Sequence, residues 1–176
     1  SFAVPLAARG LSMLRYVSGD ILLSRARVWA HGVAPDDHFD TSLALALRER
    51  WPALAKDFRH YCHDHHPQPG GLWVWASPDG VRVVNLLTQE PPASHGQKPG
   101  KATLAHVGHA LHALRRLVEK ERIESLALPR LATGVGGLSW DDVKALIEKH
   151  LGDLKIPAYV YETYRAGQRA NEPGAG

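Results

Sequence analysis

The sequence predicts an α/β protein of three layers, α/β/α, in which helices cover both faces of a central mixed sheet. Short apolar runs typical of strands alternate along the chain with segments whose apolar residues recur at helical spacing. An Asp-Gly joint between two strand-like runs predicts a hairpin, so one pair of strands is antiparallel. The 176 residues, 44% of them apolar, suffice for one domain with a sizeable core.

We expect a single domain over residues 1–165. Residues 166–176 carry Gly, Ala, Asn and Pro without apolar periodicity, so we expect a disordered tail there. No apolar run is long enough to cross a membrane, and we expect no secretory signal. The single cysteine, Cys62, excludes an internal disulfide and suits a reducing compartment. The prediction is therefore a cytoplasmic monomer without a membrane partner.

The first elements along the chain are two strands and a helix. Apolar runs predict strands over 14–17 and 28–33, and a helix follows over 43–50. Its N-cap is one of three residues with suitable side chains: Asp40, Thr41 or Ser42. After the first strand, Gly19 allows a sharp bend and Asp20 offers a carboxylate, although a simple Asx-type turn also explains Asp20.

A second helix and the hairpin come next. Pro52 begins the helix, which ends in a segment dense in His and Cys, residues 60–66. The spacing of these side chains matches no ordinary zinc site and no second ligand pair follows, so we predict a polar helix end and no metal ion. Strands over 72–76 and 81–88 flank the Asp-Gly turn.

The last elements surround a glycine loop. The longest helix is predicted over 99–122, followed by a short buried strand over 125–128. The loop contains three glycines, and a helix over 140–151 and a strand over 157–161 follow it. A glycine loop between a strand and a helix can present backbone N–H groups to an anion, and a tight turn is the alternative.

Ligands of α/β sheets bind outside the carboxyl ends of the strands. Four loops follow predicted strand ends, over 18–21, 33–42, 88–95 and 132–139. We therefore expect these loops to form one cleft. The formal net charge of +3 fits an anionic ligand, but it is far from the strongly basic surface of a nucleic-acid-binding protein.

Three motifs resemble the macrodomain family, whose members bind ADP-ribose. They read Y-V-S-G-D-I-L at 16–22, A-H-G-V at 30–33 and L-P-R-L-A-T-G-V-G-G-L-S-W at 128–140. The match looks closest to the subfamily of the terminal ADP-ribose protein glycohydrolase and the DNA ADP-ribosyl glycohydrolase antitoxins. The resemblance covers about residues 14–161. It implies a macrodomain-like fold, with ADP-ribose and ADP-ribosylated macromolecules as partners and no cofactor.

The resemblance also implies a place for each part of ADP-ribose. Asp20 would accept a hydrogen bond from the adenine amine, and Ile21 would supply the neighbouring backbone N–H. N–H groups of residues 133–137 would hold the diphosphate, and the loop over 32–42 would flank the distal ribose. The ligand-binding residues so implied are Gly19, Asp20, Ile21, Gly32, Phe39, Thr41, Ser42, Thr88, Thr133, Gly134, Val135, Gly136, Gly137 and Leu138.

Two departures from the family pattern concern catalysis. The hydrolases of the family place a lysine after the strand over 81–88, and this lysine attacks the opened distal ribose. Here the position is Gln89, whose carboxamide is not a nucleophile, and an acidic partner found in some members falls on Gly136. The family's Gly-Ala-Gly before the first helix reads Asp40-Thr41-Ser42 here, so side chains replace bare backbone beside the distal ribose.

The sequence thus favours a hydrolase that removes ADP-ribose from a modified macromolecule, protein rather than DNA, with a water in place of the lysine. Asp40 is the candidate base, His38 lies close to it in sequence, and Gln89 can orient the water. Phe39 can cover one face of the sugar. Two alternatives stay open, an N-cap role for Asp40 and a binding module without turnover.

Overall fold

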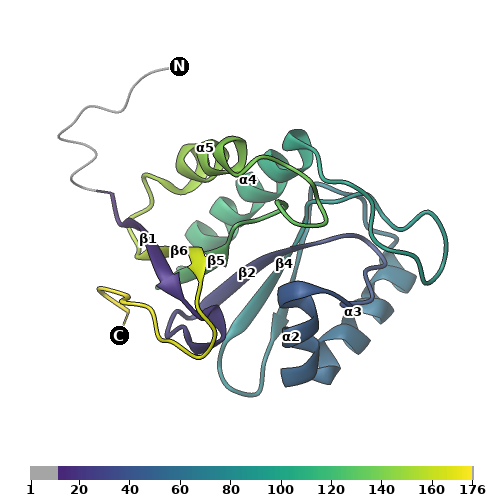
Figure 1. Cartoon of the computed structure of the whole chain (residues 1–176), viewed down its shortest axis with the longest axis horizontal. Coiled ribbons are helices and arrows are strands. Elements are labelled where there is room, and N and C mark those ends of the chain that lie inside the picture. The colour runs from purple at the N-terminus through teal and green to yellow at the C-terminus, as the bar shows by residue number, and fades with distance from the viewer. Residues whose placement is uncertain (1–11, 176) are drawn as a thin grey trace.

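The computed structural model describes residues 12–175, which form a six-stranded sheet between two layers of helices (Figure 1). Residues 1–11 of the predicted domain and Gly176 of the predicted tail lie outside the described residues. The strands are β1 (Leu14–Gly19), β2 (Val28–Val33), β3 (Leu72–Ala76), β4 (Arg82–Leu87), β5 (Leu126–Pro129) and β6 (Ala158–Tyr164). Their order is β1-β6-β5-β2-β4-β3, and every neighbouring pair is parallel except β3 and β4. The predicted mixed sheet with a hairpin is confirmed.

The helical segments are η1 (Ile21–Leu23), α2 (Ser42–Arg50), α3 (Pro52–His65), α4 (Leu104–Lys120) and α5 (Trp140–Leu151). Only α4 departs clearly from its prediction, because it begins later than residue 99. The hydroxyl of Thr103 accepts a hydrogen bond from the N–H of His106 at 3.0 Å and caps the helix there. The residues before the cap pair instead with the end of β4, through a bridge between Gln89 and Ala102. None of the described helices is long and apolar enough to cross a bilayer.

Two hydrophobic clusters, one on each face of the sheet, produce the three layers. Helices α4 and α5 cover one face, and α2 and α3 cover the other (Figure 1). Side chains of β2 alternate between the clusters. Val28 and Ala30 pack under α4 and α5, whereas Trp29 and Val33 pack under α2 and α3. A central strand covered on both faces is therefore apolar throughout, as the sequence of β2 largely is.

The pairing of the strands places the functional loops at one edge of the sheet. β2 is parallel to both β4 and β5, β5 is parallel to β6, and β6 is parallel to β1. The carboxyl ends of parallel strands lie at the same edge of a sheet, so the loops after β1, β2, β4 and β5 share that edge. This topology gathers at one edge the four loops for which the sequence predicts a common cleft.

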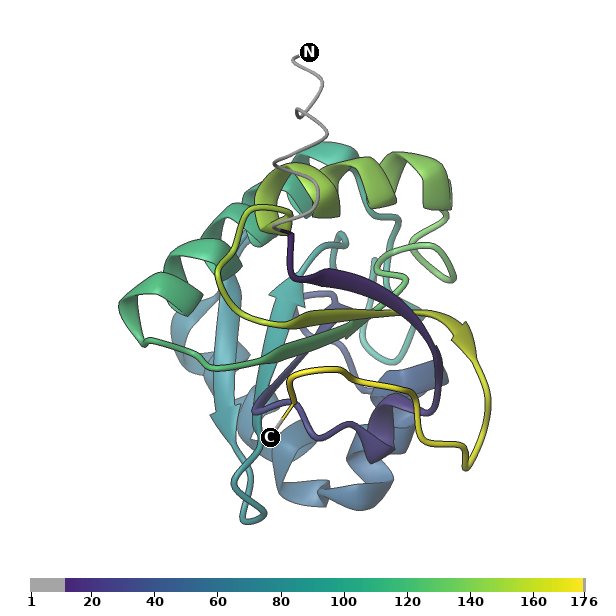
Figure 2. The same cartoon turned by 90° about the vertical axis from the view of Figure 1, so that its left-hand side faces the viewer.

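The segment after β6 is not the disordered tail that the sequence predicted. Its Glu172 accepts hydrogen bonds from the hydroxyl of Ser24 at 2.6 Å, the N–H of Arg25 at 2.8 Å and the hydroxyl of Tyr161 at 2.8 Å. The segment lies alongside η1 (Figure 2), from which it is far removed in sequence. The prediction was wrong because these contacts come from one carboxylate and from main chain, which leave no apolar periodicity.

A hydrogen-bonded polar pair lies inside the sheet. His31 on β2 and Asn85 on β4 are both buried, and Nε2 of His31 lies 2.7 Å from Oδ1 of Asn85. The Asn85 amide also donates to the carbonyl of Trp73 on β3 at 3.2 Å. Burial lowers the pKa of His31 from 6.5 to about 4. The imidazole is therefore neutral in the folded protein at pH 7.

This burial makes stability depend on pH. The unfolded chain protonates His31 below pH 6.5, whereas the folded protein keeps it neutral down to about pH 4. The contribution of His31 to the free energy of unfolding should fall by about 3 kcal/mol as the pH drops through this range. Urea unfolding of the intact protein and of His31→Gln, whose amide can still donate to Asn85, measures it. The variant should lose stability less steeply on acidification, and parallel profiles would contradict the prediction.

Candidate functional site

The loops after β2, β4 and β5 meet around Gly32. A Cβ on Gly32 would lie 2.7 Å from Oγ1 of Thr88 and 3.8 Å from the backbone nitrogen of Ala132. A larger residue would force its neighbours apart. Thr88 is fully buried, and its Oγ1 has no hydrogen-bond partner within residues 12–175. The structure thus brings Gly32, Thr88 and the glycine loop together, with a buried hydroxyl at their junction.

The glycine loop is held by two hydrogen bonds of its own main chain. The N–H of Gly137 donates to the carbonyl of Gly134 at 3.0 Å, and the N–H of Leu138 donates to the carbonyl of Ala132 at 3.1 Å. These two N–H groups serve the turn, although both residues were expected to bind ligand. Within residues 12–175, the backbone N–H groups of residues 133–136 donate no hydrogen bond. The loop is therefore a tight turn that also presents a row of available N–H donors. This row ends at residue 136, one residue earlier than predicted.

The surface of the glycine loop is open at some positions and closed at others. Thr133 turns its hydroxyl back to the main chain at 3.1 Å, and Val135 is 41% exposed. A Cβ on Gly134 would meet no atom within 4 Å. A Cβ on Gly136 would lie only 2.5 Å from the carbonyl oxygen of Ala132. Bulk is therefore excluded at Gly136 and tolerated at Gly134.

Hydrogen bonds within the turn after β1 and from the segment after β6 fix Asp20. Its Oδ1 accepts from the N–H of Leu22 at 3.0 Å and caps η1, and its Oδ2 accepts from the N–H of Gly167 at 2.9 Å. The N–H of Asp20 donates to the carbonyl of Gln168 at 2.7 Å. Asp20 is only 8% exposed and Ile21 only 5%. The Asx-type turn is thus present, and the segment after β6 holds the second carboxylate oxygen.

The loop between β2 and α2 is strained at three residues. Asp36, Phe39 and Ser42 have positive φ angles of 58°, 59° and 52°, a left-handed conformation that costs energy for residues other than glycine. Ser42 stands where the Gly-Ala-Gly pattern has its last glycine, so the backbone stays glycine-like although a side chain is present. Strain of this kind concentrates at binding and catalytic sites, because the surroundings must enforce it.

Two side chains of this loop are structural. Phe39 is fully buried, with its ring centroid 5.6 Å from that of His31 and 5.4 Å from that of Phe58. The prediction that Phe39 covers one face of the sugar is therefore wrong, because its ring is stabilised by burial in the core. Asp37 accepts hydrogen bonds from the N–H groups of Phe39 at 2.9 Å and Ala34 at 3.1 Å, and burial raises its pKa.

Asp40 is held by an ion pair and does not cap α2. Its Oδ1 lies 2.7 Å from Nη1 of Arg48, which also donates to the carbonyl of His38 at 3.1 Å. Thr41 is the N-cap residue of the helix, and no side chain forms a capping hydrogen bond there. The Asp40 side chain is 62% exposed. Its carboxylate is therefore oriented by a guanidinium and still open to solvent.

Gln89 lies at the end of β4 and is only 6% exposed. Its Nε2 donates to the carbonyl of Gly100 at 3.1 Å, so the amide braces the connection to α4. The next residue, Glu90, pairs with His106 of α4 through Oε1 and Nε2, 2.8 Å apart. The sequence prediction missed this pair, because a loop carboxylate and a histidine in a distant helix turn share no spacing signal.

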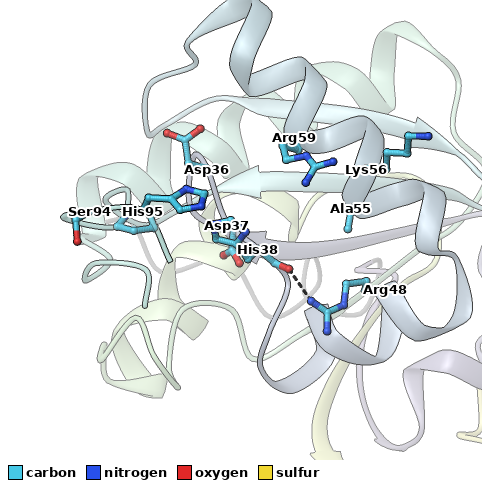
Figure 3. A pocket seen from close by; sticks show the side chains of 10 residues that line it. Asp36, Asp37, His38, Arg48, Ala55, Lys56, Arg59, Ser94 and His95 are labelled. Atoms are coloured by element: carbon cyan, nitrogen blue, oxygen red, sulfur yellow. Dashed lines mark hydrogen bonds between the residues drawn. The ribbon is translucent and has the colours of Figure 1, made fainter. Parts of the chain in front are cut away.

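The strained loop borders a pocket of about 610 Å³, between helices α2 and α3 and the loop after β4 (Figure 3). Its charged lining side chains are Asp36, Asp37, Arg48, Lys56 and Arg59. Because Arg48 already pairs with Asp40, the remaining charges balance. The ring of His38 packs edge-on against that of His95, with centroids 5.3 Å apart. Residues 12–175 contain no cluster of His, Cys, Asp and Glu side chains that could hold a metal ion.

Comparison with known proteins identifies relatives of this chain. No family model matches it. The DNA ADP-ribosyl glycohydrolase of Mycobacterium tuberculosis is 27% identical over 164 residues, which cover 91% of this chain and 45% of that protein. The ADP-ribose glycohydrolase OARD1 of Homo sapiens is 24% identical over 151 residues, or 84% of this chain and 91% of that protein. The chain therefore spans less than half of the mycobacterial relative and most of the human one.

Solved structures share the fold. The macrodomain of Thermus aquaticus DarG superposes with a TM-score of 0.72 at 24% identity, over 85% of this chain and 97% of that one. Thermosipho africanus DarTG in complex with ADP-ribose gives a TM-score of 0.73 at 22% identity, over 89% of this chain and 42% of that one. The architecture described above is thus that of these domains.

The crowding at Gly136 yields a direct test of the loop. Gly136→Ala should lower the free energy of unfolding by about 1–3 kcal/mol, because the added methyl group must displace main-chain atoms of the loop. Gly134→Ala is the matched control and should change it by less than about 0.5 kcal/mol. Guanidinium unfolding of both variants measures the difference. Equal effects would mean that the loop is not packed as described.

Proposed function

We propose that this chain, which belongs to the macrodomain family and to the subfamily of the DNA ADP-ribosyl glycohydrolases and OARD1, removes ADP-ribose from a modified macromolecule. Both relatives are named as glycohydrolases, and a related structure holds ADP-ribose. The observation that carries the proposal is the row of available N–H groups at residues 133–136 beside Gly32. Such a row binds a diphosphate without any cationic side chain.

In this proposal ADP-ribose lies along the edge of the sheet. Its diphosphate accepts hydrogen bonds from the glycine loop, and the adenine lies beside Asp20 and Ile21. The distal ribose lies beside Thr41 and Ser42, at the left-handed turn before α2. The rest of the modified macromolecule extends towards the pocket between α2 and α3. Binding energy from the diphosphate and the adenine would position the scissile bond, which is a large source of rate enhancement.

We propose direct attack by water, because Gln89 offers no nucleophile and its amide is committed to Gly100. Asp40 takes a proton from the water while the water oxygen forms a bond to the anomeric carbon. The bond from that carbon to the acceptor group breaks, and the acceptor leaves and takes up a proton from solvent. Arg48 keeps the carboxylate in place. His38, which lines the adjacent pocket, is the second candidate base, and Gln89 braces the loop.

The balanced charge of the pocket supports a protein as the modified macromolecule. A strand of DNA brings one phosphate per nucleotide, and proteins bind such strands with an excess of Lys and Arg. Here Lys56 and Arg59 are offset by Asp36 and Asp37. The names of the mycobacterial and Thermus relatives point to DNA instead. Both substrates must therefore be assayed side by side.

Binding is the first requirement of the proposal. The intact protein should bind ADP-ribose, and Asp20→Ala should weaken binding by at least tenfold, since a hydrogen bond to a charged group contributes about 1.5–3 kcal/mol. Titration calorimetry measures both affinities. Asp64→Ala, on the exposed end of α3, is the control and should leave the affinity unchanged. If the intact protein binds no ADP-ribose, the proposed function is wrong.

Turnover is the second requirement. Incubation with ADP-ribosylated protein and with ADP-ribosylated DNA should release free ADP-ribose from one of them. Asp40→Ala should reduce the rate by roughly two to four orders of magnitude, the range of a general base, with ADP-ribose affinity nearly unchanged. Assays must be run well below each melting temperature, because the variant also loses the ion pair to Arg48.

Three other results would change the assignment. Full turnover by Asp40→Ala would move the base to His38. A protein-linked ADP-ribose trapped by borohydride would show attack by a lysine and contradict the water route. Tight binding of ADP-ribose with no release from either substrate would leave a binding module as the function.

A further inference from the structure

The segment after β6 forms several hydrogen bonds with the turn after β1. We propose that Glu172 is a positioning residue, which holds this segment against the turn and thereby fixes the carboxylate of Asp20 for recognition of the base. The inference rests on the proposed function, because it takes Asp20 to face the adenine of ADP-ribose. It adds to that function a part of the chain that lies beyond the region of family resemblance.

The main chain of the segment reaches Asp20 directly. The N–H of Gly167 donates to Oδ2 at 2.9 Å, and the carbonyl of Gln168 accepts from the N–H of Asp20 at 2.7 Å. Just before them, the N–H of Arg165 donates to the carbonyl of Gly19 at 3.0 Å. Since Leu22 occupies Oδ1, each carboxylate oxygen already has one donor. The group therefore cannot rotate freely, and its remaining lone pairs have fixed directions.

Close packing also defines where the segment lies. A Cβ on Gly19 would be 2.7 Å from the backbone nitrogen of Ala170 and 2.9 Å from the Cβ of Ala170. The two segments of the chain are therefore in contact at that point. The side chain of Ala170 joins the hydrophobic cluster under α2 and α3. Figure 2 shows the segment, in yellow, running beside η1 in purple. The segment thus packs directly against the turn that contains Asp20.

Glu172 ties this segment to two elements at once. Its Oε2 accepts from the hydroxyls of Ser24 and Tyr161, and its Oε1 accepts from the N–H of Arg25. Ser24 and Arg25 follow η1 directly, whereas Tyr161 belongs to β6. Hydrogen bonds to a carboxylate are stronger than neutral ones, and no cation within residues 12–175 forms an ion pair with Glu172. Hydrogen bonds alone therefore hold the segment at this point.

A fixed carboxylate discriminates between bases by the group at position 6 of the purine. Adenine has an amine there, which donates a hydrogen bond to Asp20. Hypoxanthine has a carbonyl oxygen, which a carboxylate repels. If Glu172 positions Asp20, its loss should weaken this discrimination, and contacts of the diphosphate should persist. If Glu172 had a purely structural role, its loss would weaken the binding of both ligands equally. The ratio of the two affinities therefore distinguishes the two roles.

The test is calorimetric titration of ADP-ribose and of inosine diphosphate ribose into the intact protein and into Glu172→Ala. The intact protein should prefer ADP-ribose by at least tenfold. In Glu172→Ala the affinity for ADP-ribose should fall by about tenfold, and that for the inosine analogue by less than threefold. Glu119→Ala removes an ion pair with Arg115 on the far helix and is the matched control, which should leave both affinities unchanged.

An unchanged ratio of affinities in Glu172→Ala would overturn the inference, even if both affinities fall. If that variant does not fold, Gly167→Ala carries the test. Gly167 has a φ of 71°, and a Cβ there meets no atom within 4 Å, so the substitution strains the backbone that donates to Asp20 without a clash. It should also lower the ratio. If the intact protein binds neither ligand, the proposed function fails and the inference fails with it.

Discussion

The pairing of β2 with two parallel neighbours is the constraint on which the site depends. β2 pairs with β4 along its whole length, from Val28 to Val33, but it pairs with β5 only at Val28 and Trp29. Towards their carboxyl ends, β2 and β5 therefore diverge. Near this divergence a side chain at Gly32 has no room, because its Cβ would lie 2.7 Å from Oγ1 of Thr88, and the backbone nitrogen of Ala132, just before the glycine loop, would be in van der Waals contact at 3.8 Å. Open α/β sheets place their ligands where neighbouring connections part in this way.

The loop between β2 and α2 combines a rigid base with an exposed rim. Phe39 is buried in the core, and Asp37 closes the loop on itself through two backbone N–H groups. These contacts supply the stabilisation that offsets the left-handed backbone at Asp36 and Ser42. Asp40 is then placed on the rim, where Arg48 fixes its direction. The side chain that we propose as the general base is thus held in place by neighbours with structural roles.

Most of the fold could be predicted from the sequence, because apolar periodicity and turn chemistry report burial directly. The bounds of β2, the Asp-Gly hairpin and helix α5 are examples. Three features left no such signal. The start of α4 depends on the hydroxyl of Thr103, the direction of Phe39 depends on a backbone angle, and the order after β6 depends on Glu172. Each depends on hydrogen bonds of one side chain or on one backbone angle, which apolar periodicity does not report. Family resemblance pointed to the glycine loop, but which N–H groups are available follows only from its geometry.

The loop between β2 and α2 and the glycine loop pack in different hydrophobic clusters. Phe39 of the first loop belongs to the cluster under α2 and α3, whereas Leu131 and Leu138, at either end of the glycine loop, belong to the cluster under α4 and α5. Segments with separate cores can open separately, each with its own free energy of local unfolding. A ligand that contacts both loops, as in the proposed function, would stabilise the states in which the two loops stay together. Ligand binding would then set how cooperatively the two helical layers unfold, and amide hydrogen exchange in the helices behind each loop would measure it.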